Sequence, residues 1–449
     1  MSLDDVQQHN DSPSEDSSVE RYYPGTFGSL AIRDFRFLWF ANLLASFAMQ
    51  MQIVARGWLI YDMTNSPMAL TWVMLSFMLP SFVFSLAGGV IADRLPKKPI
   101  IVVAQLFNAI ATTFLAYIIF TGEVHFWHFI IIGLFNGTVL SFSMPARSAL
   151  IPEVVGEANL VNAMALQSAT FNLSRILGPA IAGVFIAVFA AGNTTSTIGV
   201  GIVFFLIAGL YLVAVIATTM VNCVGLPAAS NNASPLDDVK EGFAYMWQNK
   251  IILGLLIMSF VPFTFGFSAS FLLPAFNKDV ISGGPDDLGL LITSMGAGAF
   301  FGSMILARLG DIKRKGRVMF VSAYLWGIAV AAFALSQNLG MALILGAATG
   351  FFSSVFGSLN MSVIQLIVRP DIRGRVMAIM MMTFGLMPIG VIPVSALAEF
   401  VGIDVALLFS AAMLMLSMVF LAYFFPDLLK LDKGHGDHIL IKNSDMAGS

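Results

Sequence analysis

The sequence predicts an all-α membrane protein whose twelve transmembrane helices form two pseudo-symmetric six-helix bundles. Of its 449 residues, 58% are hydrophobic and only 11% are charged, whereas soluble domains carry about 25% charged residues. Apolar runs of the ~20 residues needed to cross a bilayer recur twelve times between polar segments. Because lipid offers no hydrogen-bond partners to the backbone, each run is expected to be a helix.

The apolar runs form two groups of six around a polar interval. The expected spans are 37–61, 68–92, 99–121, 126–146, 161–190 and 198–222, then 251–276, 287–308, 317–337, 340–367, 376–400 and 403–425. The expected units are an acidic, disordered tail over 1–36, bundles over 37–222 and 251–425, a central loop over 223–250 and a tail over 426–449. In the loop, Ser234-Pro235 is typical of a helix start, which indicates either an interfacial helix or a plain linker.

Lysine and arginine are divided unevenly between the two sides of these spans. Of the 23 Lys and Arg residues, Lys278 alone falls on one side, Arg56 and Arg175 fall inside spans, and the other 20 lie on the opposite side. The positive-inside rule places that basic side, with both termini, in the cytoplasm. We expect the first span to act as an uncleaved insertion signal, because no signal-peptide pattern precedes it.

A charged turn, "GGVIADRLPKKP", follows the second span. Its charges would serve as a topology anchor in any membrane protein, but the order of residues also resembles the loop motif of the major facilitator superfamily. The residues that carry this resemblance are Gly89, Asp93, Arg94, Lys97 and Lys98. The resemblance implies a cytoplasmic charge latch that closes when a transporter faces outward. Pro96 stands where the family has a second glycine, so we expect a stiffer turn.

The second six spans repeat features of the first. "GSMILARLGDIKRKGR" corresponds to the turn after span two and holds Arg308 and Asp311. "RPDIRGRVMA", with Arg373 and Arg375, corresponds to "PARSALIPE", with Glu153. Parallel six-helix repeats are how the superfamily is built, so the resemblance implies that these residues complete the cytoplasmic latch, Glu153 with nearby arginines.

Three phrases resemble one branch of the superfamily, the enterobactin-exporter-like drug:proton antiporters. They are "PARSALIPE", "SRILGPAIAG" and "RPDIRGRVMA". The second is also similar in part to the superfamily's antiporter motif through Gly178, Pro179 and Gly183, although Ser174 and Ala182 replace glycines. A generic proline kink is the alternative. The resemblance implies export and is silent on the cargo.

Two arginines fall inside expected spans, where a charge costs at least about 2.5 kcal/mol unless it meets water or a partner. The cavity candidates that share their helix faces are Met49, Gln52, Arg56, Ser168, Asn172 and Arg175. Snorkelling is the alternative for Arg56, and a structural bond to the kinked backbone is the alternative for Arg175. If both face a cavity, anionic or acceptor-rich cargo is favoured, such as a catecholate siderophore.

Spans seven and eleven are rich in phenylalanine and methionine, which suit surfaces that accept varied shapes. The pocket candidates there are Phe263, Phe267, Met382 and Met387, with packing against lipid or neighbouring helices as the alternative. No Asp, Glu or His falls in the middle of an expected span. The candidates for proton coupling are therefore Glu399 and Asp62 at outer span ends, where a solvated helix-end residue is the alternative.

The sequence lacks the motifs of zinc proteases, nucleophile elbows and P-loops and the filter of a channel, so no enzyme or channel is expected. It predicts a monomeric exporter of a small amphipathic or anionic molecule in a bacterial inner membrane. Alternating access would be driven by proton antiport, with no cofactor, metal or nucleic-acid partner. An importer, a lysolipid flippase and an uncoupled facilitator are the alternatives, and a non-transporting sensor is a further one.

Overall fold

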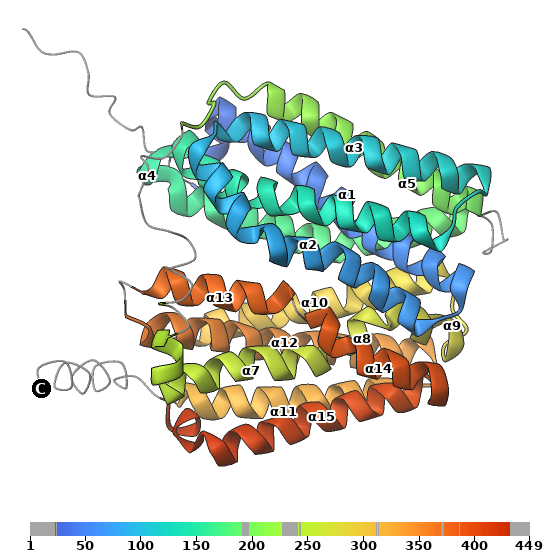
Figure 1. The fold of residues 1–449 in the computed structure, drawn as a ribbon, viewed down its shortest axis with the longest axis vertical. Coiled ribbons are helices and arrows are strands. Elements are labelled where there is room, and N and C mark those ends of the chain that lie inside the picture. The colour runs from blue at the N-terminus through green and yellow to red at the C-terminus, as the bar shows by residue number, and fades with distance from the viewer. Residues whose placement is uncertain are drawn as a thin grey trace, which may run out of the picture.

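The computed structural model describes residues 23, 25–190, 197–226, 241, 244–310, 312, 314–369, 372–385 and 387–431. Asp311 and the expected helix start at Ser234-Pro235 lie outside these residues. Two bundles of roughly parallel helices lie side by side (Figure 1). We call them the N-half, up to residue 226, and the C-half, from residue 250 onward.

The N-half is built from five long helices. They are α1 (Arg33–Thr64), α2 (Pro67–Arg94), α3 (Lys97–Thr121), α4 (Phe126–Phe189) and α5 (Thr197–Thr219), preceded by the short 3₁₀ helix η1 (Gly28–Ala31). Ser66 begins α2 as an N-cap whose hydroxyl accepts from the Ala69 N–H at 3.2 Å. Gly122 ends α3 in a left-handed conformation, as helix C-termini commonly do.

The C-half contains more helix breaks than the N-half. Its helices are α7 (Lys250–Gly266), α8 (Ser268–Phe271), α9 (Leu273–Asp279), α10 (Pro285–Leu309), α11 (Lys315–Ala334), α12 (Leu339–Ile367), α13 (Arg373–Gly385), α14 (Met387–Val401), α15 (Ile403–Phe424) and the 3₁₀ helix η2 (Pro426–Lys430). α7 with α8 and α9 forms the seventh span, and α13 with α14 forms the eleventh.

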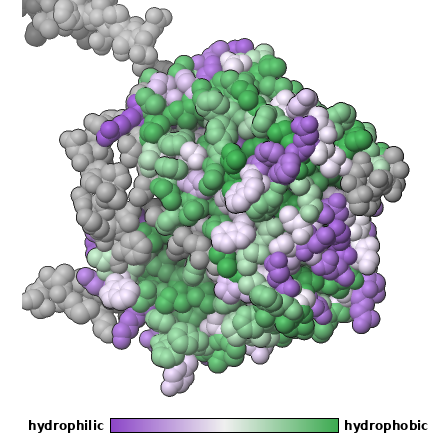
Figure 2. All heavy atoms as spheres, turned by 45° about the vertical axis from the view of Figure 1, so that its right-hand side comes forward, coloured by the Kyte–Doolittle hydropathy of each residue, from purple (hydrophilic) through white to green (hydrophobic). Residues whose placement is uncertain are grey.

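The expected number of membrane crossings agrees with these helices. Within the described residues, ten helices are long and apolar enough to span a bilayer. α4 is 64 residues long, enough for two crossings at 1.5 Å per residue, and the α13–α14 pair adds another. The chain is a multi-pass membrane protein of twelve crossings. Hydrophobic side chains cover most of the face seen in Figure 2, as contact with lipid requires.

Two expected boundaries differ from the structure. α1 begins at Arg33 and η1 precedes it, so part of the expected disordered tail is helical. The loop expected after residue 146 is also helical. α4 continues through Pro145 and Pro152 and breaks only at Gly156, where φ is +69°, a conformation that favours glycine. Arg147, expected in a loop, therefore lies inside a helix.

The two halves meet along a seam between α4 and α10. A Cβ on Gly289 of α10 would lie 2.6 Å from the Pro179 carbonyl oxygen, and a Cβ on Gly183 of α4 would lie 3.1 Å from the Gly289 Cα. The Thr293 hydroxyl donates to the Ile176 carbonyl at 2.8 Å. The missing side chains let the two backbones approach closely, as small residues do between membrane helices.

We expect Gly289→Val to separate the halves at this seam, because its side chain would overlap the α4 backbone. Distances between spin labels on the two halves should lengthen, and the melting temperature should fall by several degrees. Gly209→Val in α5 is the matched control, since a Cβ there meets nothing within 4 Å. Unchanged distances in Gly289→Val would contradict the close seam.

Candidate functional site

We distinguish the two ends of the bundle by the course of α1. The near end holds the start of α1 and the end of α15, and the far end holds the turn between α1 and α2 (Figure 1). The residues expected to form a cytoplasmic latch lie at the near end. The residues expected to couple protons, Asp62 and Glu399, lie at the far end.

At the near end, the basic residues after α2 bind within their own half. Lys97 forms an ion pair with Glu153 at 2.6 Å, and Lys98 donates to the Thr219 and Val221 carbonyls. Glu153 also accepts from the Leu226 N–H at 3.0 Å. Glu153 thus pairs with a lysine of the N-half, whereas the sequence predicted arginine partners.

The glycines of this turn have different surroundings. A Cβ on Gly88 would overlap the Ser141 carbonyl of α4, whereas a Cβ on Gly89 would meet nothing within 4 Å. The close helix contact therefore lies at Gly88, one residue before the motif position. Arg94 is exposed at the end of α2. The Asp93 side chain lies outside what the structure describes.

The latch residues of the C-half likewise have partners outside the N-half bundle. Arg375 pairs with Glu241 of the central loop at 2.8 Å, and Arg373 donates to the Val368 carbonyl at 3.3 Å. Arg308 is exposed at the end of α10. The near-end contacts given above for Lys97, Lys98, Arg373 and Arg375 lie within one half or reach the central loop.

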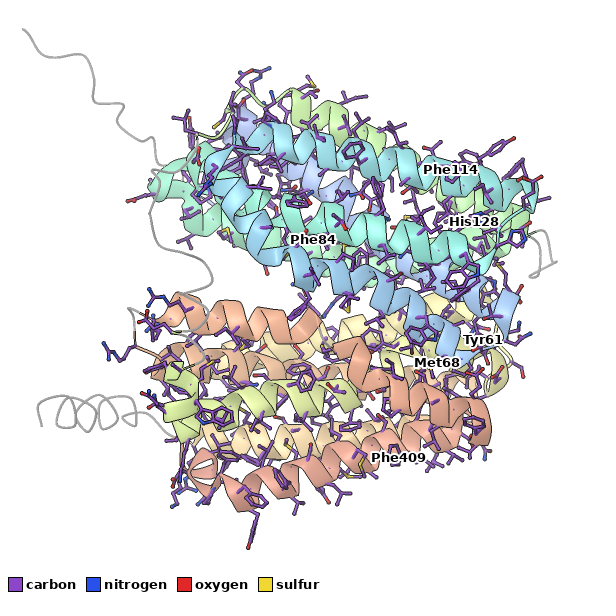
Figure 3. All side chains as sticks on the ribbon, in the orientation of Figure 1. Tyr61, Met68, Phe84, Phe114, His128 and Phe409 are labelled. Atoms are coloured by element: carbon purple, nitrogen blue, oxygen red, sulfur yellow. The ribbon has the colours of Figure 1, made fainter. Side chains whose placement is uncertain are left out.

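At the far end, polar contacts do join the halves. Lys278 of α9 lies 2.8 Å from Asp62 of α1 and donates to Asn65 at 3.1 Å. The neighbouring Asp279 accepts from the Tyr61 hydroxyl. Figure 3 shows Tyr61 and Met68 at the far end of the N-half, beside the C-half. Asp62 was a site candidate from the sequence, whereas Tyr61, Lys278 and Asp279 were not.

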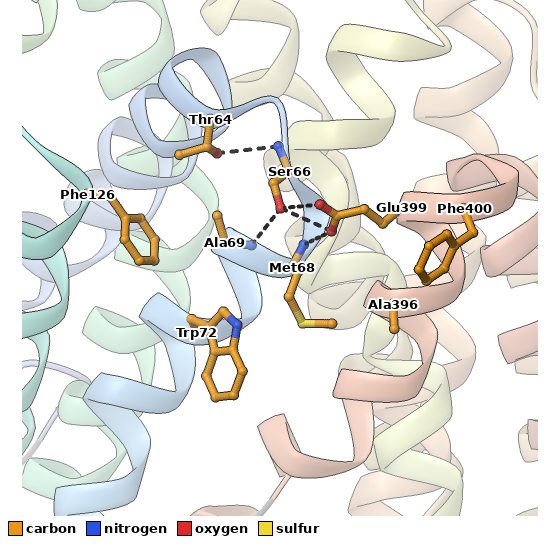
Figure 4. Close-up of a pocket in the computed structure, with 9 residues that line it drawn as sticks. All are labelled: Thr64, Ser66, Met68, Ala69, Trp72, Phe126, Ala396, Glu399 and Phe400. Atoms are coloured by element: carbon orange, nitrogen blue, oxygen red, sulfur yellow. Dashed lines mark hydrogen bonds between the residues drawn. The ribbon is translucent and has the colours of Figure 1, made fainter.

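Glu399 of α14 makes a second far-end contact. Its carboxylate accepts from the Ser66 hydroxyl at 2.9 and 3.0 Å and from the Met68 N–H at 3.3 Å (Figure 4). It therefore caps the first turn of α2, where a negative charge is favourable. Thr71 and Ser395 share a hydrogen bond deeper along the same two helices. We call the contacts of Asp62 and Tyr61 with α9, together with those of Glu399, the far-end latch.

Beside Glu399 the surface is hollowed. The hollow has a volume of about 720 Å³ and lies between α2, the start of α4 and α14. Its lining is Thr64, Ser66, Met68, Ala69, Trp72, Phe126, Ala396, Glu399 and Phe400 (Figure 4). The Glu399 side chain is exposed at the far end.

One face of α1 points toward the C-half. Gly57 lies on it, since a Cβ there would come within 2.9 Å of Pro274. Ile53 and Met49, one and two turns toward the near end, are 44% and 36% exposed. The expected cavity residue Met49 therefore lies on the face toward the C-half. Gln52 is buried beside this face, and its amide nitrogen has no hydrogen-bond partner.

Three arginines lie inside the N-half with a buried Nε that has no partner. They are the expected Arg56 and Arg175 and the unexpected Arg147. No described acidic residue forms an ion pair with any of them. On α4, Ser168 is exposed, and Asn172 donates to the Ser168 carbonyl within the same helix. These two residues are one and two turns from Arg175.

The kink residues on α4 pack against both halves. A Cβ on Gly178 would lie 2.8 Å from the Gln50 Cβ of α1, and Pro179 and Gly183 line the seam with α10. A Cβ on Gly296 of α10 would lie 3.2 Å from the Arg175 carbonyl oxygen. Arg175 thus lies where α1, α4 and α10 converge.

The phenylalanine candidates of the C-half belong to a ring cluster. The Phe263 and Phe267 rings stack at 5.3 Å, and both meet Trp326 edge-on. Phe263 is 7% and Met387 is 5% exposed, so both are packed inside the C-half, while Phe267 is half-buried. The side chain of Met382 lies outside what the structure describes.

Comparisons with known proteins agree with this arrangement. The sequence profile of a family described as transmembrane secretion effectors matches residues 24–438. Macrolide efflux protein A of Streptococcus pyogenes is 26% identical over 375 residues, which cover 81% of this chain and 88% of that protein. Enterobactin exporter EntS of Shigella boydii serotype 18 is 25% identical over 299 residues, covering 66% and 68%.

The fold is also that of solved transporters. A bacterial homologue of the human lysosomal transporter Spinster, solved inward-facing and unoccupied, matches with a TM-score of 0.65 at 14% identity. The match covers 89% of this chain and 98% of that one. The fold class and the exporter branch that the sequence predicted are thereby confirmed.

Proposed function

Since this chain belongs to the transmembrane secretion effector family of the major facilitator superfamily, we propose that it exports a small amphipathic or anionic molecule by alternating access and proton antiport. The similarity to efflux-type relatives supports export as the direction of transport. The single observation that carries the mechanism is the far-end latch, whose bonds tie the two halves at one end.

The latch supports a state open toward the cytoplasm. We place both termini in the cytoplasm of a bacterial cell, because the near end carries nearly all Lys and Arg. The far end is then the outer face. Polar contacts between the halves at the outer face are what an inward-facing transporter requires.

Export then needs the latch to open. When cargo from the cytoplasm occupies the interior, the halves rock about the α4–α10 seam and the bonds of Asp62 and Glu399 break. In that state the near-end residues, among them Arg94, Arg308 and Arg375, would meet across the inner face. Lys97 pairs with Glu153 and Arg375 pairs with Glu241 in this structure, and opening of the outer face would exchange such contacts for contacts across the inner face.

Proton coupling follows from the chemistry of Glu399. As a carboxylate it accepts from two donors at the start of α2, the Ser66 hydroxyl, which both oxygens share, and the Met68 N–H. A proton taken up from the outer face removes the charge that the helix N-terminus favours and weakens the cap. External acid would therefore open the outer face. Antiport is completed when this proton leaves to the cytoplasm as the halves return to the inward-facing state, which restores the Glu399 carboxylate and its cap on α2.

The cargo class follows from the interior charges. Three guanidinium groups without acidic partners favour a molecule that carries an anionic or acceptor-rich group. The apolar side chains of Met49 and Ile53 on α1 suit the hydrophobic part of such a cargo molecule. The working unit is one chain, the two halves of which enclose the path, and cargo and protons are its only small-molecule partners; nucleic acid plays no role.

Everted membrane vesicles with an acidified interior test this function. We expect a siderophore, a macrolide or another amphipathic acid to enter vesicles that contain the protein and to release protons, read with a pH-sensitive dye. Vesicles without the protein are the control. Uptake that ignores the pH gradient would indicate an uncoupled facilitator, and movement out of the vesicles would indicate an importer. Movement of lysolipid alone would indicate a flippase, and no flux of any kind would overturn export.

A further inference from the structure

We propose that the hollow beside Glu399 binds an amphipathic organic cation, and that this ligand holds the far end of the protein closed. The hollow is built by both halves: residues between 64 and 72 and Phe126 belong to the N-half, and Ala396, Glu399 and Phe400 belong to the C-half. The ligand is not the cargo. Only the statement that the hollow faces outward rests on the proposed function.

The size and lining of the hollow suit a small organic molecule. Its volume of about 720 Å³ lies within the range of roughly 300–1,000 Å³ that is usual for ligand sites. Trp72, Phe126 and Phe400 supply aromatic side chains from three different helices. Trp72 is 45% and Phe400 is 86% exposed, so their rings are accessible to a ligand. Figure 4 shows the Glu399 carboxylate between the Trp72 and Phe126 rings on one side and the Phe400 ring on the other.

Glu399 gives the hollow a negative charge that lacks a counter-ion. It is the one charged residue of the lining, and it forms no ion pair with a described lysine or arginine. Lys278, the basic residue of the far end, is engaged by Asp62 and Asn65. A carboxylate has about four acceptor positions, and the Ser66 hydroxyl and the Met68 N–H occupy at most three of those of Glu399. The carboxylate can therefore accept from a bound cation as well.

This lining selects a cation with an apolar part. The carboxylate repels anions, so the hollow does not suit the anionic cargo proposed above. An ammonium group can pair with Glu399, and the face of an aromatic ring such as Trp72 also attracts a cation. The apolar part of the ligand can then cover the exposed rings. At a membrane surface this chemistry has two sources, a soluble amphipathic amine and the ammonium headgroup of a lipid.

The hollow is complete only while the far end is closed. α2 and α4 form one side of it and α14 forms the other, and the bond from the Ser66 hydroxyl to Glu399 at 2.9 Å joins the two sides. When the halves part at this end, the lining is divided between them. A ligand that contacts both sides binds the closed state alone and shifts the population toward that state. At ten times its Kd, the ratio of closed to open protein should rise about elevenfold.

Calorimetric titration of the purified full chain in maltoside detergent tests the site with a matched pair of probes. These are 4-phenylbutylammonium and its uncharged analogue 4-phenylbutan-1-ol, each corrected for its heat of mixing with empty micelles. We expect the wild-type protein to bind the ammonium about fivefold more tightly than the alcohol, the upper end for an ion pair with an exposed carboxylate. Equal affinities would overturn the proposal without the use of any variant.

Substitutions then locate the preference. Glu399→Gln should make the two affinities equal, whereas Asp404→Asn, which removes an exposed far-end carboxylate outside the lining, should keep the preference. Ala396→Trp fills the hollow without a change of charge and should abolish the binding of both probes. A preference that survives Glu399→Gln, or binding that survives Ala396→Trp, with normal elution and helicity, would overturn the site.

Spin labels at Met63 and Val401, with Cys223 replaced by serine, test the hold on the far end. Neither labelled residue is part of the lining. We expect 4-phenylbutylammonium to lower the fraction of protein with a long distance between the labels, and the alcohol to have a smaller effect at the same concentration. An unchanged distance distribution at a saturating concentration of the ammonium would overturn the hold.

Two further arms separate the sources of the cation and the two proposals. Displacement of the ammonium probe by dihexanoylphosphatidylethanolamine, but not by dihexanoylphosphatidylglycerol, would support the site and identify a lipid headgroup as the source. Displacement by neither lipid would support the site and assign it to soluble amines. Ammonium binding without vesicle efflux would keep the site and reject the exporter, and efflux with equal affinities for the two probes would keep the exporter and reject the site.

Discussion

Replacing Lys278 with glutamate is expected to shift the protein toward a state that is open at the far end. Lys278 bonds Asp62 and Asn65 of the opposite half, and its side chain is only 31% exposed. The substitution removes an ion pair and places a carboxylate next to Asp62. The lost ion pair and the new repulsion each contribute about 1 kcal/mol. Their sum exceeds the 1.4 kcal/mol that corresponds to a tenfold change in an equilibrium constant, so we expect the open fraction to rise at least tenfold.

Spin labels at Met63 and Val401, on a background with Cys223 replaced by serine, would measure this opening. Lys430→Glu is the matched control, because Lys430 pairs with Asp427 within η2 and both are exposed. The exchanged pair Asp62→Lys with Lys278→Asp should return the closed distance. An unchanged distance distribution in Lys278→Glu would show that the ion pair does not hold the halves together.

Replacing Glu399 with glutamine is expected to remove proton-driven efflux. The amide oxygen can still accept from Ser66, but the side chain can no longer take up a proton or place a negative charge at the start of α2. We expect the initial rate of pH-driven efflux to fall at least tenfold, while exchange of cargo across equal pH continues. In the wild type the far end should open as the external pH falls, and in Glu399→Gln the open fraction should not depend on the external pH.

Asp404→Asn is the control for this variant. Asp404 lies in the first turn of α15 at the far end and is exposed, and it forms no ion pair with a described residue of the N-half. Transport by Asp404→Asn should match the wild type. If Glu399→Gln retained full pH-driven efflux, the proton carrier would be another group and Asp62 would be tested next.

The fold could be predicted because hydrophobic length and charge placement are properties of single segments. A run of apolar residues crosses the membrane wherever it packs, and Lys278 stood out because it is the one basic residue on its side. Glu399 was also found by position alone. Its partners, Ser66 and the Met68 amide, could not be found, because no spacing within one segment tells which helix lies beside α14.

Arg147 was missed for a different reason. Two prolines and two further charged residues, Glu153 and Glu157, lie near it and are typical of a loop, and this composition outweighed the helical pattern. A signal was present: Pro145 and Pro152 are seven residues apart and so share one face of a helix, which can bend without a break. The true break is at Gly156, whose positive φ only its surroundings reveal. The pairing of Glu153 with Lys97 depends on that same helical extension.

The capping of α2 has a consequence for how the protein can be observed. Its first turn has a permanent cap, the Ser66 hydroxyl on the Ala69 amide, and a removable one, the Glu399 carboxylate on the Met68 amide. When the halves part, α2 keeps its start and does not have to refold, but the Met68 N–H is released to water. Hydrogen exchange at this one amide therefore follows the fraction of time that the outer face is open, without any label on the protein.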